Sequence, residues 1–214
     1  MSDASKPEEY AAIIESVLFA TDTPLSLNDL VAVLDGVDAA TVKRSIAHLN
    51  EEYDAHPHSF HITQVAGGYQ LCARPQYARW IKRLYRGKVS SRLSQAALEC
   101  LSIVAYKQPI SRTEIEAVRG VNVEGVLRTL LERSLIRIAG RGEGLGRPLL
   151  YATTNEFLRY FGLNKLSDLP KLDELQEMLR ERDREMQEGM DTGDEGVPLF
   201  PAPPTPVFER SEAE

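Results

Sequence analysis

A short motif that recurs 85 residues further along the chain constrains the fold more than any other feature. Pro24-Leu25-Ser26 is followed by Asp29, and Pro109-Ile110-Ser111 is followed by Glu114. A serine placed three residues before an acidic side chain is typical of a capping box, in which the serine begins a helix and the acid bonds back to it. A helix cap is worth about 1 kcal/mol. Two caps at one offset therefore predict two copies of one structural unit.

The correspondence between the two units continues after the caps. Leu30 matches Ile115 at the same offset, and after a one-residue deletion Asp38 matches Asn122 as the cap of a third helix. Each unit is predicted to contain three helices followed by a two-stranded hairpin. This order is the layout of a winged helix. The fold class is therefore mostly α with small β wings (α+β), and the architecture is two tandem winged-helix domains.

Hydrophobic periodicity places the main elements. The first unit begins with a helix near residues 8–20, and its hairpin turns at Gly67-Gly68. The second unit begins with a helix at residues 94–106 and ends in strands at 135–139 and 149–153. Apolar residues at helical spacing mark the buried faces of the helices. A glycine-rich wing, residues 140–147, connects the last two strands.

These patterns divide the chain into five segments. Winged-helix domains are predicted at residues 1–73 and 93–166, and a basic amphipathic linker helix at 74–92 connects them. A polar helix follows at 167–188. We expect the acidic, proline-rich tail at 189–214 to be disordered, because it contains little apolar surface to bury.

Charge is segregated along the chain. The net charge is −7, but residues 1–73 carry −8, residues 74–147 carry +9 and residues 148–214 carry −8. The basic middle could attract a polyanion, or it could pair with acidic segments of this chain or of a partner. The candidate contacts for DNA or another anion are Arg79, Lys82, Arg83, Arg86, Arg141 and Arg147.

The composition predicts a globular protein of the cytoplasm. The chain is 43% hydrophobic and 27% charged, which is ordinary for a soluble domain. No apolar run approaches the roughly 18 residues of a membrane helix. The N-terminus lacks the apolar core of a secretory signal. Cys72 and Cys100 are far apart and are expected to be reduced thiols.

No motif in the sequence predicts catalysis, a metal or a cofactor. Gly142, Gly144 and Gly146 precede a strand, whereas a phosphate-binding loop opens a helix. The histidines at positions 56, 58 and 61 lack a fourth ligand at metal spacing and are predicted to lie in a solvated turn. We therefore predict that the protein is not an enzyme and that it binds no cofactor.

A winged helix often inserts its third helix into the major groove of DNA. In the second unit the outward residues of that helix are mixed in charge: Glu124, Arg128, Thr129, Glu132 and Arg133. Two acids among five residues suit a phosphate-rich groove poorly. A DNA-binding transcription regulator is therefore the alternative hypothesis and not the first.

Surplus apolar surface favours a protein partner. The helix at residues 94–106 is apolar nearly all round, although a small domain needs only one apolar stripe. The rest could be covered by the linker helix or by another chain. The candidate partner-binding residues are Leu98, Leu101, Ile103, Val104 and Tyr106.

An ordered series of motifs resembles the segregation and condensation protein B (ScpB) family. The series covers about a third of the chain and includes Ile103-Val104-Ala105-Tyr106-Lys107-Gln108-Pro109-Ile110, Arg119-Gly120-Val121-Asn122, Gly146-Arg147-Pro148-Leu149-Leu150-Tyr151 and Glu156-Phe157-Leu158. Cys100 and Ala152 depart from the family pattern, which has Thr or Ser and Gly there.

The resemblance implies what the chain binds and where it acts. It implies two winged-helix domains, a homodimer, and binding to the kleisin ScpA, which bridges the SMC ATPase heads. The expected role is that of an adaptor in a bacterial condensin-like complex for chromosome segregation and condensation. The expected location is the cytoplasm, at the nucleoid through the complex, with indirect or weak DNA contact and no membrane contact.

Overall fold

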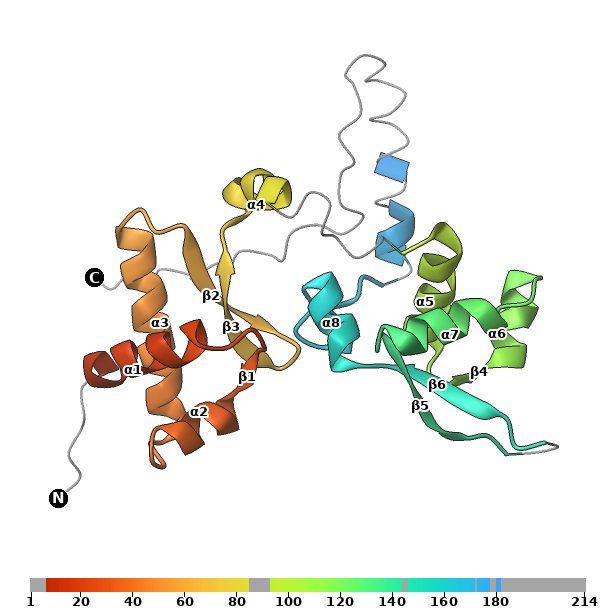
Figure 1. The fold of residues 1–214 in the computed structure, drawn as a ribbon, viewed down its shortest axis with the longest axis horizontal. Helices are drawn as coiled ribbons and strands as arrows, with labels where there is room; N and C mark the ends of the chain where they lie inside the picture. Colours follow the sequence, from red (N-terminus) through yellow and green to blue (C-terminus); the bar gives the residue numbers. More distant parts are fainter. Residues whose placement is uncertain (1–6, 85–92, 144–145, 172, 178–179, 182–214) are drawn as a thin grey trace, which may run out of the picture.

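The computed structural model describes residues 7–84, 93–143, 146–171, 173–177 and 180–181, with side chains from Tyr10 onward (Figure 1). The described residues form two units, each with its own three-stranded sheet and its own hydrophobic core. In Figure 1 the first unit is coloured red to yellow, and the second is coloured green to cyan.

The first unit is a three-helix cluster with a small antiparallel sheet. Its elements are α1 (Pro7–Phe19), β1 (Leu25–Ser26), α2 (Leu27–Val33), α3 (Ala39–Ala55), β2 (Phe60–Val65) and β3 (Gly68–Ala73). The strand order is β1-β3-β2, with Leu25 opposite Tyr69. The core lies between the helices and this sheet. Its buried aliphatic residues include Ile14, Leu30 and Val42.

The second unit repeats this order of elements. It contains α5 (Gln95–Lys107), β4 (Ile110–Ser111), α6 (Arg112–Arg119), α7 (Glu124–Glu132), β5 (Ile136–Arg141) and β6 (Leu149–Thr153). The strand order is β4-β6-β5, with Ile110 opposite Tyr151. The helical bundle and the β5–β6 wing confirm the predicted α+β winged-helix fold for both units.

The recurring serines cap helices as predicted. Ser26 Oγ accepts from Asp29 N at 3.2 Å, while Ser26 N donates to Asp29 Oδ2 at 2.9 Å. In the second unit Ser111 Oγ accepts from Glu114 N at 3.4 Å, and Ser111 N donates to Glu114 Oε2 at 2.8 Å. Hydrogen bonds from the serine side chain and backbone hold the pKa of both acids below its usual value. Both capping boxes are therefore complete.

The third helix of the second unit is capped differently from the prediction. α7 begins after Val123, whose N–H donates to Glu116 Oε1 at 3.2 Å. Asn122 Oδ1 instead accepts from Glu124 N at 3.0 Å. The prediction that Asn122 caps this helix was wrong by one residue. Glu116 therefore satisfies the N–H of the cap residue Val123, while Asn122 bonds the first amide of α7.

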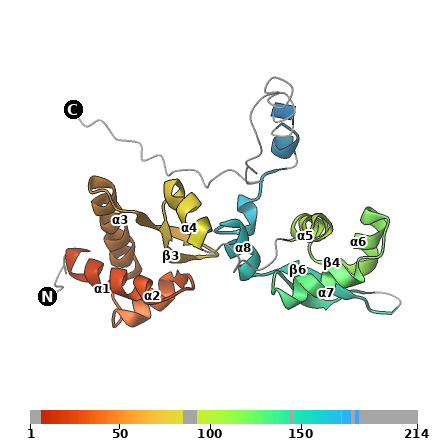
Figure 2. The same ribbon diagram turned by 45° about the horizontal axis from the view of Figure 1, so that its top comes forward.

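The linker helix lies beside the first unit. It consists of a 3-10 turn, η1 (Pro75–Tyr77), followed by α4 (Ala78–Leu84). Figures 1 and 2 both place α4 away from α5. Among the described residues, the linker helix therefore does not cover the apolar surface of α5. Residues 85–92 lie outside the described part of the chain, and so does the candidate contact Arg86.

α8 (Asn155–Phe161) lies at the junction of the two units (Figure 2). Ala66 N, in the β2–β3 turn, donates to Leu163 O at 2.8 Å, and Gly67 N donates to Asn164 Oδ1 at 3.0 Å. Arg159 Nη2 on α8 donates to Asp22 O at 2.9 Å. The junction is therefore made of hydrogen bonds, several of them to backbone atoms.

The chain after α8 turns back along the second unit. A 3-10 turn, η2 (Leu166–Asp168), precedes helical residues at 173–177 and 180–181, within the polar helix predicted at 167–188. The predicted disordered tail at 189–214 lies outside the described residues. Among the helices of the described ranges, none combines the length and the hydropathy required to cross a bilayer.

Candidate partner-binding and anion-binding surfaces

The five candidate partner-binding residues on α5 separate into two groups. Leu101 and Val104 are 1% and 0% exposed and belong to the core of the second unit. They cannot contact a partner while that core is intact. Leu98 and Ile103 are partly buried against the core, and Tyr106 is 39% exposed. The accessible part of the predicted surface therefore consists of Leu98, Ile103 and Tyr106.

Tyr106 also fixes the segment that follows α8. Its hydroxyl donates to the carbonyl oxygen of Pro170 at 2.7 Å, a contact between residues 64 positions apart. Burial raises the pKa of this hydroxyl, and the nearby carboxylate of Glu174 raises it further. The Tyr106 side chain therefore stays neutral at ordinary pH and is partly exposed on α5.

Arg119 joins α6 to α5. Its Nη2 lies 2.7 Å from Glu99 Oε2, and its Nη1 donates to Ala96 O at 3.1 Å. Nη1 also lies 3.4 Å from Cys100 Sγ. Burial raises the pKa of the Cys100 thiol, partly offset by the Arg119 charge, so Cys100 is a thiol and not a thiolate. This role of Arg119 could not be predicted from the sequence, because its partners lie at least 19 positions away.

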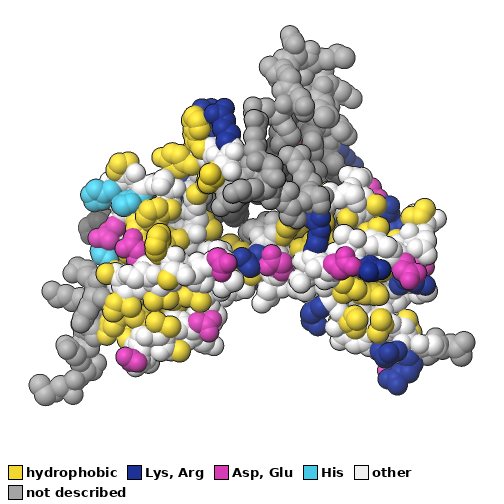
Figure 3. Space-filling view, in the orientation of Figure 1, with side chains coloured by type: hydrophobic (Ala, Val, Ile, Leu, Met, Phe, Trp, Pro, Cys, Tyr) yellow, Lys and Arg dark blue, Asp and Glu magenta, His cyan; other side chains and the backbone are white. Residues whose placement is uncertain are grey.

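α4 combines exposed apolar side chains with three cations. Trp80 and Leu84 are 52% and 74% exposed, and Ile81 is also exposed. The guanidinium carbons of Arg79 and Arg83 lie 4.4 and 4.9 Å from the Trp80 ring centroid. Within the described ranges no ion pair joins an acidic side chain to the three cations of this helix, Arg79, Lys82 and Arg83. Figure 3 shows yellow and dark blue side chains together over α4.

A second basic patch lies on the wing of the second unit. Arg141 ends β5 and Arg147 precedes β6, and both are exposed. Arg141 Nη1 donates to Arg147 O at 3.4 Å, which keeps the two residues together at the tip of the wing. Dark blue side chains gather at this tip in Figure 3. The candidate anion contacts therefore form two separate patches, one on α4 and one on the wing.

The outward charges of α7 are paired within the protein. Arg128 Nε lies 2.9 Å from Glu132 Oε1, and Glu124 Oε2 lies 2.8 Å from Arg112 Nη1 on α6. Binding a phosphate would require these arginines to leave their carboxylates. These ion pairs agree with the prediction from the sequence that α7 is poorly suited to binding in a DNA groove.

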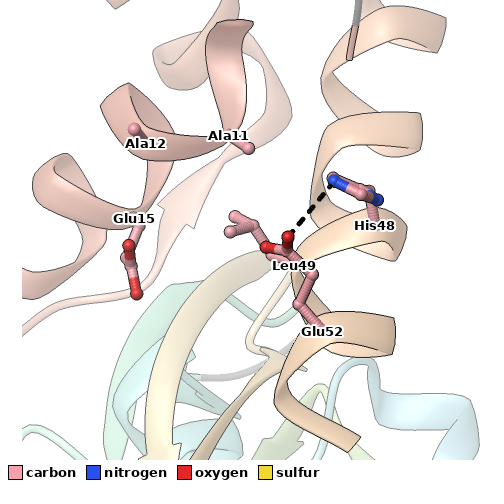
Figure 4. Close-up of a pocket in the computed structure, with 6 residues that line it drawn as sticks. All are labelled: Ala11, Ala12, Glu15, His48, Leu49 and Glu52. Carbon is pink, nitrogen blue, oxygen red and sulfur yellow. Dashed lines mark ion pairs between the residues drawn. The ribbon is translucent and has the colours of Figure 1, made fainter. Parts of the chain in front are cut away.

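An open hollow of about 390 Å³ lies between α1 and α3. Figure 4 shows Glu15, His48 and Glu52 around it, with Ala11 and Leu49 on its apolar side. His48 Nε2 lies 3.6 Å from Glu52 Oε1, an ion pair when the imidazole is protonated. The Tyr53 hydroxyl donates to Glu15 Oε1 at 2.9 Å, and burial together with this contact raises the pKa of Tyr53. The hollow is a small acidic recess and holds no catalytic arrangement.

His58, which lies between α3 and β2, packs with two aromatic rings. The centroid of His58 lies 5.2 Å from Tyr53 and 5.3 Å from Phe60. Burial lowers the pKa of His61, and the Arg74 charge lowers it further. No group of three or more potential metal ligands converges among the residues that the structure describes. His58 therefore belongs to a small cluster of aromatic side chains at the end of α3.

Comparison with known proteins places both units in one family. The model of the family described as "Segregation and condensation complex subunit ScpB" matches residues 12–172. The segregation and condensation protein B of Geobacillus thermodenitrificans is 47% identical over 173 residues, covering 80% of this chain and 82% of that protein. That of Syntrophotalea carbinolica is 46% identical over 173 residues, covering 81% of this chain and 87% of the relative.

A solved structure gives a further comparison. The crystal structure of ScpB from Mycobacterium tuberculosis is 30% identical, with 75% of this chain and 99% of that chain covered, and its TM-score is 0.36. The family model extends from α1 through both winged helices to the segment that follows η2. This chain therefore belongs to the family of segregation and condensation complex subunits ScpB.

Proposed function

We propose that the protein is a non-enzymatic adaptor that binds the kleisin ScpA as a homodimer. In this role it acts in chromosome segregation and condensation as part of a complex with the SMC ATPase. The observation that carries the proposal is the family match over residues 12–172, which includes both winged-helix units.

We assign the kleisin contact to the accessible face of α5. Tyr106 offers a neutral aromatic surface, and Ile103 and Leu98 provide apolar area beside it. Aromatic side chains are enriched among the few interface residues that contribute most of the binding energy. The Arg119–Glu99 ion pair fixes α6 against α5 and so helps to hold the helix that carries this face. A kleisin segment with an apolar helix face fits such a surface.

Co-expression with ScpA from the same organism tests the adaptor role. Size-exclusion chromatography with light scattering is expected to show a dimer alone and a larger complex when ScpA is present. Failure to co-purify at low ionic strength contradicts the proposal. An unchanged complex after loss of the Tyr106 side chain contradicts only the assignment to α5.

The second candidate function is a DNA-binding transcription regulator. The exposed arginines of the wing, Arg141 and Arg147, are the observation that favours it. It requires sequence-selective binding that weakens steeply with salt. Equal affinity for unrelated duplexes would exclude it, and would agree with an adaptor that touches DNA weakly.

A further inference from the structure

α4 presents a face that is both aromatic and basic and that stays exposed among the described residues. Trp80, Ile81 and Leu84 leave apolar area in contact with solvent, and the described residues of the second unit do not cover it. Arg79 and Arg83 lie over the indole ring at 4.4 and 4.9 Å. Exposed apolar surface bordered by charge is typical of an interaction site. Its occupant must be acidic and must contain apolar side chains.

The C-terminal tail of the same chain has this chemistry. Residues 194–209 carry Asp194, Glu195 and Glu209, contain no basic residue and so have a net charge of −3. α4 carries Arg79, Lys82 and Arg83 and has a net charge of +3. The two segments are therefore equal and opposite in charge.

The tail also matches the apolar part of the surface. The apolar pairs Leu199-Phe200 and Val207-Phe208 lie among the five prolines of this segment. Proline-rich segments favour an extended conformation and dock on aromatic side chains at little cost in conformational entropy. An arginine-flanked tryptophan is suited to such a segment, because it offers a flat ring and charge together.

The length of the intervening chain allows the contact. Twelve residues separate Glu181, the last described residue, from Asp194. They span about 40 Å when fully extended and roughly 19 Å on average as a flexible linker. Figures 1 and 2 both place α4 and the helical residues 173–177 on the same side of the molecule. The linker to residues 194–209 therefore starts on the side of the molecule where α4 lies and can extend to about 40 Å.

We infer that residues 194–209 dock on the exposed face of α4 within the same chain. The apolar pairs of the tail cover Trp80, Ile81 and Leu84, and its carboxylates pair with Arg79, Lys82 and Arg83. The tail then shields a basic surface from other anions. This inference is independent of the proposed kleisin contact, which lies on α5.

Trp80 is the only tryptophan of the chain, so its fluorescence reports on α4 alone. The test compares the full chain with a full-length variant in which Leu199, Phe200, Val207 and Phe208 are changed to Ser. In the variant we expect the emission maximum to move to longer wavelength and acrylamide to quench more strongly. Thr205→Ala, which alters neither apolar pair, is the matched control. Identical emission and quenching in the full chain and the fourfold variant would overturn the inference.

A charge exchange distinguishes this contact from nonspecific collapse. Lys82→Glu is expected to expose Trp80, and adding Asp194→Lys and Glu195→Lys is expected to restore its protection. Raising the ionic strength to about 1 M shortens the Debye length to about 3 Å and should also expose the ring. If the reversed tail charges do not restore the protection of Trp80, the proposed ion pairs between the tail and α4 are contradicted.

Three further outcomes identify other occupants of α4, and each contradicts the inference. Protection that disappears on dilution assigns the face to a second copy of the chain. Protection that appears only after ScpA is added assigns it to the kleisin. A Trp80 response to duplex DNA at physiological salt, with equal strength in the full chain and the tail variant, assigns it to nucleic acid. Circular dichroism of every variant verifies that the domains remain folded.

Discussion

The guanidinium of Arg119 on α6 lies 2.7 Å from the carboxylate of Glu99 on α5, and the same group donates to the carbonyl of Ala96. The Arg119 side chain is only 18% exposed. Hydrogen bonds to a charged group are worth about 1.5–3 kcal/mol. We therefore expect Arg119→Met to destabilise the second domain by about 2 kcal/mol, measured by urea unfolding and by hydrogen exchange of α5 amides.

An exposed ion pair provides the control for Arg119. The Arg128 and Glu132 side chains are 81% and 61% exposed, and such pairs contribute about 0–1 kcal/mol. Arg128→Met should therefore leave the urea midpoint nearly unchanged. Equal effects of the two substitutions would show that the buried position of Arg119 has no special role.

Ser111→Ala removes the hydroxyl at the centre of a capping box. Because Ser111 is 3% exposed and its hydroxyl bonds Glu114, we expect a loss of about 1–2 kcal/mol. Ser102→Ala is the matched control, since that hydroxyl donates to Leu98 O on an exposed helix face. The control should be neutral or slightly stabilising, because alanine is the better helix former. Thermal unfolding of the two variants side by side measures the difference.

Glu114 makes the second domain sensitive to acid. Hydrogen bonds from Ser111 hold its pKa below the usual value of 4.5, so the folded protein binds this proton more weakly than the unfolded chain. The contribution is present above pH 4.5 and is lost as the pH falls through the lower folded-state pKa. We expect Glu114→Gln to lower the unfolding temperature at neutral pH, with the difference shrinking as the pH falls below 4.5. A constant difference across the titration would contradict the linkage.

Tyr106 is the residue on which the proposed kleisin surface depends most. Truncation of a well-placed interface aromatic costs about 2 kcal/mol or more, which weakens binding by roughly 30-fold or more. We expect this loss for Tyr106→Ala, measured by calorimetric titration with ScpA. Ile138→Ala on the wing strand β5 removes a side chain that is 50% exposed and should leave affinity unchanged. Tyr106→Phe separates the hydroxyl bond to Pro170 from the ring surface.

The wing arginines predict weak DNA contact that does not depend on sequence. Each cation that neutralises a phosphate contributes roughly 0.9 to the slope of log affinity against log salt. Changing Arg141 and Arg147 together to Ala should therefore reduce the slope by about two and should leave ScpA binding intact. Fluorescence anisotropy with an unrelated duplex measures the slope. An unchanged slope would show that the wing does not touch DNA.

Local chemistry made the two capping boxes predictable. Ser26 and Ser111 act on residues three positions away, so their spacing in the sequence already contains the geometry. The predicted cap of α7 was one residue too early: Val123 is the cap, and its N–H is bonded by Glu116 of α6. Glu116 belongs to a different helix, and the spacing of capping and apolar residues in the sequence does not predict contacts between helices.

The apolar helix α5 shows a different limit. Its sequence is apolar on most sides, so periodicity could not separate core positions from surface positions. The structure places Leu101 and Val104 inside and leaves Tyr106 at the surface, because α7, α6 and the sheet occupy the inner sides. The role of Arg119 was equally hidden, since it depends on two helices packing side by side.

The hydrogen bond between Ala66 N and Leu163 O, at 2.8 Å, uses only main-chain atoms. Ala66 holds a left-handed backbone with φ 52°, which aims its N–H at the second domain. Such a bond does not depend on which side chain either residue carries, provided that the residue at position 66 tolerates this conformation. The joint between the two domains can therefore persist while the sequence at both positions drifts. Proline at position 66, which lacks the amide hydrogen, is the substitution that would remove it.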